Sequence, residues 1–263
     1  MVAAAKLRRA QENIVRARPY AYKLREVLKR VSEKVDPNLH PLLRIRSPEK
    51  VAYVVVTADR GLCAGFNNNI ISAAENRIRQ EGYEKSSLIC VGRKGYDYWK
   101  RSGPPILDRY ISLFNNLEYA HAQQITDKVI DLYIREKFDR VLFIYNEFKS
   151  AIQQTVITEQ LLPMQTEKSD NDNDTGGQID YLFEPGPLRI LDTIIPLNVG
   201  IQIWRILLES SASEQGARMT AMESATTNAE EMIDSLTLYY NRIRQAAITR
   251  EISEIVGGAE ALQ

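Results

Sequence analysis

The apolar residues near the amino terminus follow a spacing that leaves few possible folds. Over residues 1–35, the steps between successive apolar side chains alternate between four and three residues without a break. This alternation is the a/d seam of a coiled coil, which is narrower than the apolar stripe of a helix lying on a globular core. The seam consists of Ala3, Leu7, Ala10, Ile14, Ala17, Ala21, Leu24, Leu28, Val31 and Val35. Because it keeps its phase through Pro19, we expect a local kink at this proline, and an end to the helix only at Pro37 and Pro41.

The carboxyl-terminal region has a seam of the same kind. Its residues are Met219, Met222, Thr226, Ala229, Ile233, Leu236, Tyr240, Ile243 and Ala247. From Ile248 the seam shifts by one residue, onto Ile252, Ile255, Ala259 and Leu262, which predicts a different partner for the tip. No proline follows Pro196, so residues 197–262 are predicted to form almost one helix. Since a bare apolar face is unstable in water, part of this helix should pack on the chain and its tip on another protein.

The two ends carry opposite charge. Residues 1–35 hold ten basic and three acidic side chains (+7), whereas residues 205–263 hold five basic and nine acidic ones (−4). Two complementary seams predict an intramolecular antiparallel coiled coil. The whole chain has 34 basic and 34 acidic residues, which disfavours a dedicated nucleic-acid carrier.

The middle of the chain alternates short β-branched runs with helical stretches. We predict, in order, a strand over 51–57, a helix over 67–80, a strand over 88–91, a helix over 94–101, a strand near 106–111, a helix over 118–137, a strand over 140–145 and an edge strand over 151–161. This order favours an α/β fold with a mostly parallel, Rossmann-like sheet. The polar tract over 165–178 is predicted to be an acidic loop.

The segment from Thr57 to Asn67 is the best candidate for chemistry, because a glycine-containing turn between a strand and a helix is where such sheets bind phosphate. The match is weak. Gly61 and Gly65 give neither the Rossmann fingerprint nor a P-loop, so a structural turn is the simpler interpretation. His40 and His121 do not supply a triad-like base for Cys63, and no metal-ligand spacing occurs. The sequence predicts no catalytic residues, no metal and no cofactor.

Composition also bears on the compartment. Cys63 and Cys90 form no disulfide framework, which fits a reducing compartment. The longest uncharged apolar stretch, residues 193–204, is shorter than the ~20 residues that a membrane-spanning helix needs. The amino terminus does not read as a secretory signal. We expect a chain that faces the cytosol and does not insert into a membrane.

Several long motifs together resemble one family. They are MVAAAKLRRAQ (1–11), TADRGLCAGFN (57–67), DYLFEP (180–185), ASEQGARMTAMESATTNAEEM (212–232) and YNRIRQAAITREISEIVGGAEAL (240–262). In this order they resemble the γ subunit of bacterial-type F-type ATP synthases over essentially the whole chain. The resemblance implies a non-catalytic rotor whose terminal helices form a shaft inside a ring of α and β subunits. It also implies a Rossmann-like domain without nucleotide.

Site residues follow from the resemblance, position by position. Arg244 and Gln245 match residues that bind a catch loop of β, with Thr249 and Glu251 supporting them. Arg8 and Arg9 match the basic side of the shaft that faces the β levers. The remaining set, which matches the foot on the membrane c ring, is Tyr181, Phe183 and Glu184.

The resemblance also implies an organisation and a location. The expected shaft comprises residues 1–50 and 187–263, the α/β domain 51–164, and the acidic loop with the c-ring-facing foot 165–186. The partners are α, β, ε and the c ring, without nucleic acid, and the complex lies on the cytoplasmic face of the bacterial plasma membrane. Family members usually carry a further segment ahead of residues 1–11, without which the carboxyl-terminal helix is expected to lose part of its shaft partner.

Two other functions remain open from the residues alone. The turn at Gly61 and Gly65 is compatible with a nucleotide-binding α/β enzyme, and the basic helix over 1–35 with a coiled-coil nucleic-acid binder. Neither explains the second seam or its shift after Ala247.

Overall fold

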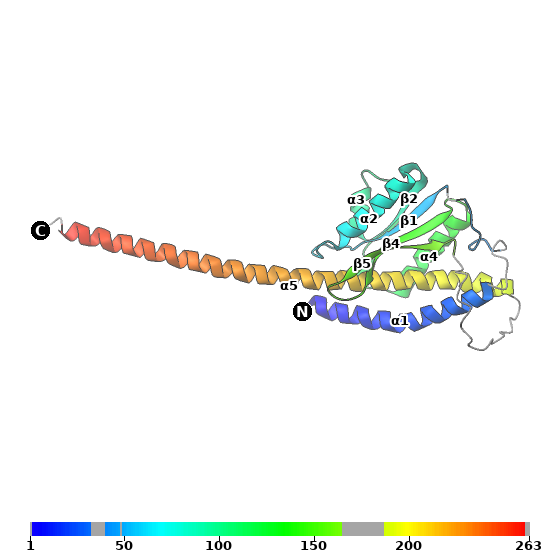
Figure 1. The fold of residues 1–263 in the computed structure, drawn as a ribbon, viewed down its shortest axis with the longest axis horizontal. Helices are drawn as coiled ribbons and strands as arrows, with labels where there is room; N and C mark the ends of the chain where they lie inside the picture. The colour runs from blue at the N-terminus through cyan, green and yellow to red at the C-terminus, as the bar shows by residue number, and fades with distance from the viewer. Residues whose placement is uncertain (1, 33–39, 48, 165–186, 261–263) are drawn as a thin grey trace. The chain divides into compact units, whose positions relative to one another are not determined.

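The computed structural model describes residues 2–32, 40–47, 49–164 and 187–260 (Figure 1). These residues belong to two compact units, Met1–Met219 and Thr220–Gln263. The helices are α1 (Val2–Ser32), α2 (Phe66–Glu81), α3 (Arg93–Trp99), α4 (Tyr119–Ile134) and α5 (Pro187–Glu260), with short 3₁₀ turns η2 (Tyr83–Lys85) and η3 (Leu113–Asn115). The strands are β1 (Val51–Val56), β2 (Ser86–Val91), β3 (Ile106–Tyr110), β4 (Arg140–Phe148) and β5 (Gln154–Leu162).

The five strands form one sheet in the order β3-β2-β1-β4-β5. The pairs β1/β2, β1/β4 and β2/β3 are parallel, and β5 joins β4 as an antiparallel edge strand. The prediction of a mostly parallel α/β sheet is confirmed. Within residues 51–162 the predicted element boundaries differ from the observed ones by a few residues at most, and most at the carboxyl ends of α4 and β4 and at the amino end of β5.

Helices cover both faces of this sheet (Figure 1). Successive residues of a strand point to opposite sides, so each strand contributes side chains to two apolar clusters, one on each face. Tyr53 and Val55 face the apolar cluster of α2 and α3, to which Ile70, Ile78 and Trp99 belong. On the other face, Val54 and Val56 belong to a larger cluster with α4 and the first part of α5. The α4 and α5 members of that cluster are Ala122, Ile125, Val129, Tyr133, Leu191, Ile195, Val199, Ile203, Ile206 and Leu207.

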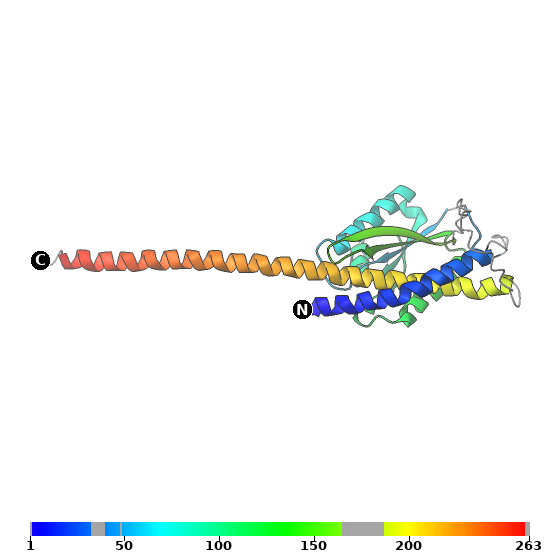
Figure 2. The same ribbon diagram turned by 60° about the horizontal axis from the view of Figure 1, so that its bottom comes forward.

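Helix α1 lies antiparallel beside the first part of α5, as both ribbon views show (Figures 1 and 2). The seam predicted for this helix is the face that it buries: Leu7, Ala10, Ile14, Ala21 and Leu28 are all buried. The first three pack against Leu208 and Ala212 of α5. The side chains of Ala3 and Val31, and all of Val35, fall outside what the structure describes.

The predicted antiparallel pairing of the two terminal helices is confirmed, but α1 pairs with an earlier part of α5 than the predicted seam. Residues 191–219 of α5 cover α1, whereas the side chains of the seam predicted from Met222 onwards are exposed. Helix α1 has 31 residues and α5 has 74, so α1 cannot cover all of α5. The long helix also begins ten residues earlier than predicted and continues through Pro196, as α1 continues through Pro19. Packing on both sides of Pro196, by Ile195 and Val199, compensates for the backbone hydrogen bond that a proline cannot donate.

One helix of the described residues, within α5, is long and apolar enough to cross a membrane by length and composition. Its most apolar 18-residue window has a mean hydropathy of 1.3, and 56% of the window is buried inside the protein. A core helix meets the same two criteria, and the residues of α5 that pack on the sheet account for this burial.

Candidate partner-binding surface

The carboxyl-terminal unit exposes a row of large apolar side chains. Met222, Ile233, Leu236, Tyr240 and Ile243 of the predicted seam are all exposed, and Tyr240 retains 64% of its accessible surface. We call these five residues the exposed seam. Contiguous apolar surface of this kind marks a protein interaction site. The chain supplies no cover for it among the described residues of this unit.

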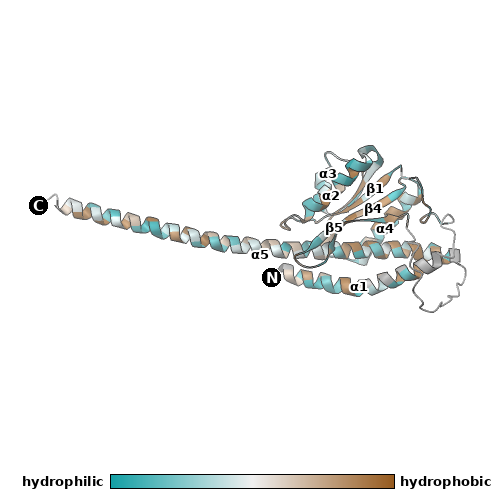
Figure 3. Ribbon diagram, in the orientation of Figure 1, coloured by the Kyte–Doolittle hydropathy of each residue, from teal (hydrophilic) through white to brown (hydrophobic). Residues whose placement is uncertain are grey.

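Apolar residues also occur on a second face of the same helix segment, so that brown and teal positions alternate along it in Figure 3. Met232 and Tyr239 are 63% and 62% exposed, and each directly precedes a residue of the exposed seam. Consecutive helical residues point about 100° apart. Two apolar faces on one helix fit a partner that surrounds the helix better than a single partner helix.

All four residues predicted to meet the β catch loop follow the exposed seam on the same helix. Arg244, Gln245, Thr249 and Glu251 are all exposed. At about 100° per residue, Arg244 and Glu251 project within roughly 20° of each other, and Gln245 and Thr249 within roughly 40°. The hydroxyl of Ser253 donates a hydrogen bond to the Thr249 carbonyl oxygen at 2.8 Å. All four residues therefore lie within about 160° of the helix circumference and are open to a single approaching loop.

The two arginines predicted to face the β levers lie on α1. Arg8 and Arg9 are both exposed, and Arg8 pairs with Glu12 at 3.3 Å. The Arg8 and Glu12 side chains are 84% and 53% exposed, so this pair contributes little to stability. The predicted c-ring contacts Tyr181, Phe183 and Glu184 lie outside the described residues, as does the whole 165–186 segment.

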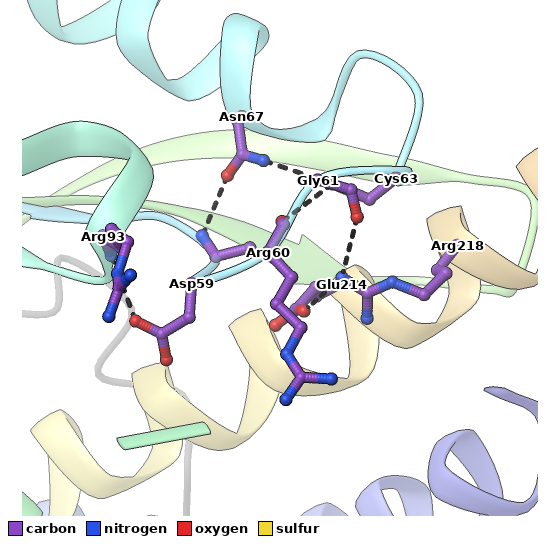
Figure 4. Close-up of polar contacts among 9 residues, drawn as sticks. Asp59, Arg60, Gly61, Cys63, Asn67, Arg93, Glu214 and Arg218 are labelled. Atoms are coloured by element: carbon purple, nitrogen blue, oxygen red, sulfur yellow. Dashed lines mark hydrogen bonds and ion pairs between the residues drawn. The ribbon is translucent and has the colours of Figure 1, made fainter. Parts of the chain in front are cut away.

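The turn from Thr57 to Asn67 is held by its own side chains (Figure 4). Asn67 accepts a hydrogen bond from Ala58 N at 2.9 Å and donates one to Cys63 Sγ at 3.2 Å. Asp59 accepts hydrogen bonds from the backbone of Arg93 and Ser112 at 3.1 and 2.8 Å. These bonds support the structural interpretation of the turn.

The backbone of this turn differs from what its glycines suggest. Leu62 and Ala64 have positive φ angles of 60° and 46°. Gly65 has φ −77°, and Gly61 is not among the glycines with positive φ. The unusual conformation is therefore carried by two residues that have side chains, and Leu62 remains 74% exposed.

Helix α5 occupies the place where an α/β sheet of this topology binds a nucleotide. That place is the crevice beyond the carboxyl ends of the two neighbouring strands at which the strand order reverses: here β1 leads through α2 to β2 on one side, and β4 leads to β5 on the other. Arg218 donates to the Gly61 carbonyl oxygen at 3.3 Å, after β1 (Figure 4). Ser213 donates to the Asn146 carbonyl oxygen at 3.1 Å, at the end of β4. The chain's own helix therefore fills the crevice.

Glu214 is buried beside this crevice, with only 4% of its surface exposed. Burial raises the pKa of its carboxyl, and Arg218, whose guanidinium lies 2.6 Å away, acts in the opposite direction. Nearby Asp59 raises the pKa further. Pairing with Arg218 offsets part of the cost of placing this carboxylate in the core.

Sequence reasoning missed a partly buried ion pair between α5 and the sheet. Arg205 Nη2 lies 2.8 and 2.6 Å from the two carboxylate oxygens of Glu159 on β5. Tyr145 of β4 donates to the same carboxylate at 2.8 Å and accepts from Arg205 at 3.2 Å. The only sequence signal is that Arg205 interrupts an apolar run, since its partners are distant in the chain.

An apolar pocket of about 340 Å³ was also not predicted. It lies between α1, α4 and α5 and is lined by Ala17, Tyr20, Tyr119, Leu197, Ile201 and Trp204. The rings of Tyr119 and Trp204 meet edge to face, with centroids 6.0 Å apart. Tyr20 is 58% exposed, so an apolar partner can reach the pocket from solvent.

The described residues contain no group of three or more His, Cys, Asp and Glu side chains that could hold a metal ion. The sulfurs of Cys63 and Cys90 are buried and unpaired with each other. Burial raises the pKa of both thiols, and that of Cys90 to about 12. Neither thiol is in the ionised form that a nucleophile requires.

Comparison with known proteins shows which family this chain resembles. An ATP synthase family model matches residues 1–262. The ATP synthase gamma chain of Heliobacterium modesticaldum is 50% identical over 266 residues, and that of Chlorobium limicola 46% over 269; each alignment covers 100% of this chain and 91% of the relative. A central-stalk chain of the Tetrahymena thermophila mitochondrial ATP synthase aligns with a TM-score of 0.66 at 25% identity, covering 86% of this chain and 96% of that one.

A chain of the OSCP/F1/c-ring assembly of the Euglena gracilis mitochondrial ATP synthase aligns with a TM-score of 0.60 at 18% identity, covering 98% of this chain and 95% of that one, which bears on the fold alone. The family match and the close relatives both extend over essentially the whole chain. The chain belongs to the ATP synthase gamma-chain family, the central stalk of the F-type ATP synthase.

Proposed function

We propose that the chain is a non-catalytic rotor, which couples ion flow through the membrane c ring to ATP synthesis or hydrolysis in a ring of α and β subunits. The observation that carries this proposal is the carboxyl-terminal unit, whose large apolar side chains are exposed on more than one face. Such a helix is suited to a surrounding protein sleeve. The family match supports a ring of ATP synthase subunits as this sleeve.

The mechanism is mechanical. An asymmetric rod presents different faces in turn to three β subunits and changes their relative affinities for ADP, phosphate and ATP. The size of each change is limited by the rod's differential contacts with the β conformations. Exposed ion pairs contribute only about 0–1 kcal/mol, so steric exclusion by the rod should outweigh any one salt bridge.

The contact residues are assigned by resemblance and supported by exposure. Arg244, Gln245, Thr249 and Glu251 form the surface for the β catch loop. Arg8 and Arg9 provide positive charge for the acidic β levers. The segment over 165–186 contributes the foot on the c ring. Because the close relatives are bacterial, we place the complex on the cytoplasmic face of the plasma membrane.

The apolar pocket is our candidate site for the ε subunit. Its lining residues come from the two shaft helices and from α4, so a partner bound there holds the shaft and the α/β domain together. Tyr20→Ala removes an exposed lining side chain and should weaken retention of ε during gel filtration. Tyr83→Ala, which removes an exposed aromatic from η2, is the matched control.

The decisive experiment is reconstitution with α, β and ε from the same organism. We expect the chain to co-purify with them and ATP hydrolysis to drive its rotation, whereas the isolated chain has no ATPase activity. Hydrolysis by the isolated chain, or failure to join an α and β ring, would contradict the proposal. A nucleotide-binding enzyme is disfavoured because α5 fills the crevice between β1 and β4.

A further inference from the structure

Three polar side chains of α5 are spaced four residues apart and all bond to the sheet. Arg205 binds Glu159 of β5, as described above. Glu209 accepts a hydrogen bond from Phe148 N of β4 at 3.1 Å. Ser213 donates to the Asn146 carbonyl oxygen at 3.1 Å. We call Arg205, Glu209 and Ser213 the α5 polar row; side chains at this spacing share one face of a helix.

The polar row is shielded from water. Glu209 and Ser213 are 2% and 0% exposed, and the side chains of Arg205 and Glu159 are 17% and 20% exposed. Burial lowers the pKa of the Arg205 guanidinium, but Glu159 and Tyr145 together outweigh burial and raise that pKa overall. The guanidinium of Arg205 is therefore charged, and an ion pair shielded from water adds less stability than apolar side chains of similar size.

What the polar row adds is directional bonding between α5 and the sheet. Apolar contact is non-directional and tolerates sliding of one surface over another. Hydrogen bonds fix both distance and angle, and the bonds that involve ionised groups are the strongest of them. Bonds from three successive turns of α5 to β4 and β5 therefore resist both translation and rotation of the helix against the sheet.

We propose that the α5 polar row is the rigid joint through which the α/β domain and the shaft helix pass torque to each other. This inference rests on the proposed rotor function, because only a rotor loads the joint. The domain surface and α5 then turn as one body, and weakening the joint adds elastic compliance between them without stopping catalysis in the surrounding ring.

The test variant is Arg205→Met with Glu159→Gln, which removes the pair without leaving a buried charge alone. Arg205→Lys keeps the charge and is the rescue variant. Arg140→Met with Glu81→Gln is the matched control, because that ion pair is similarly shielded but joins β4 to α2 within the domain. Thermal unfolding shows whether each variant is folded.

Rotation is then followed in single assembled complexes of α, β and the full chain. A bead is attached through Lys85→Cys on the α/β domain or through Arg189→Cys on the first turn of α5; both positions are exposed. For the test variant we expect a wider angular spread within each dwell when the bead is on the domain, and an unchanged spread when it is on α5. The rescue and control variants should match the parent chain.

If the angular spread of the domain bead is unchanged in the test variant, the proposal that the α5 polar row is a rigid joint is wrong. A parent chain that assembles but does not rotate would contradict the rotor function instead. If the double variant fails to assemble, Ser213→Ala removes a single hydroxyl from the row and should widen the same spread to a smaller extent. No widening in that variant would count against the proposal.

Discussion

A Cβ atom placed on Gly92 would lie 2.0 Å from the carbonyl oxygen of Thr57. Gly92 has a φ of 89° and follows directly after β2, where its N–H bonds to Tyr110 O at 2.8 Å. This close approach packs the turn after β1 against the start of α3.

Gly92→Ala should therefore destabilise the chain by about 3 kcal/mol or more, because the side chain meets backbone in addition to the strain of a positive φ. Urea unfolding of the full chain measures the loss. Gly82→Ala is the control: its φ is 97°, and nothing lies within 4 Å of the added Cβ. An equal loss in both variants would mean that backbone strain alone matters.

Arg244→Ala with Gln245→Ala should weaken coupling of the assembled complex without changing the stability of the chain, because both side chains are exposed. We expect rotation to persist at lower ATPase activity, since steric contact by the rod remains. Arg250→Ala removes the same charge on another face of the helix and should have little effect. Complete loss of rotation in an assembled complex would show that these two residues, and not the rod's shape, dominate.

Stability should fall as pH falls below about 6.5, the ordinary pKa of histidine, partly through His40. Burial lowers the pKa of His40 in the folded chain, although Asp192, 3.4 Å away, opposes this. Its Nδ1 accepts a hydrogen bond from Leu42 N, which requires that nitrogen to be unprotonated. The unfolded chain thus binds more protons, and the free energy of unfolding rises with pH in this range.

Urea midpoints measured between pH 5 and pH 8 test this dependence. His40→Gln keeps polar atoms at the position but cannot titrate, so it should flatten the dependence between these values. An equally steep dependence in this variant would assign it to other groups.

Dithiothreitol should leave the ATPase activity of the assembled complex unchanged, because both thiols are buried and apart. Iodoacetamide should label Cys90 slowly in the native chain at pH 8, since burial raises its pKa to about 12, and quickly in urea. Rapid native labelling of Cys90, or a dithiothreitol-dependent rate, would contradict this prediction.

The elements of the fold were predictable because their signals are local. Residue spacing and residue type over a few positions are enough to predict the α1 seam from Leu7 to Leu28 and the β-branched strands. Which surface covers a seam is not local information: the two seams are both apolar, and only the structure shows that α1 lies against residues 191–219. Likewise, the sequence predicts a helix boundary at Pro196, but α5 continues through this proline because tertiary packing stabilises the helix on both sides of it.

The candidate site also has a part that the sequence predicts and a part that only the structure shows. The exposed seam follows from periodicity, whereas Arg244 and Gln245 came from resemblance, and the structure adds their exposure. The Arg205–Glu159 pair joins residues 46 positions apart, and no sequence pattern predicts that they meet. Buried pairing depends on the packed fold, so single-sequence reasoning has no access to it.

The two borders of the sheet have different consequences for an unassembled chain. Strand β5 is held against α5 through Glu159, whereas β3 forms the other border, with only five residues. Asp108 and Arg109 place charge along it. A short, charged border is a poor template for adding a strand from another molecule. The unassembled chain therefore has little tendency to polymerise by strand addition before it binds the other subunits.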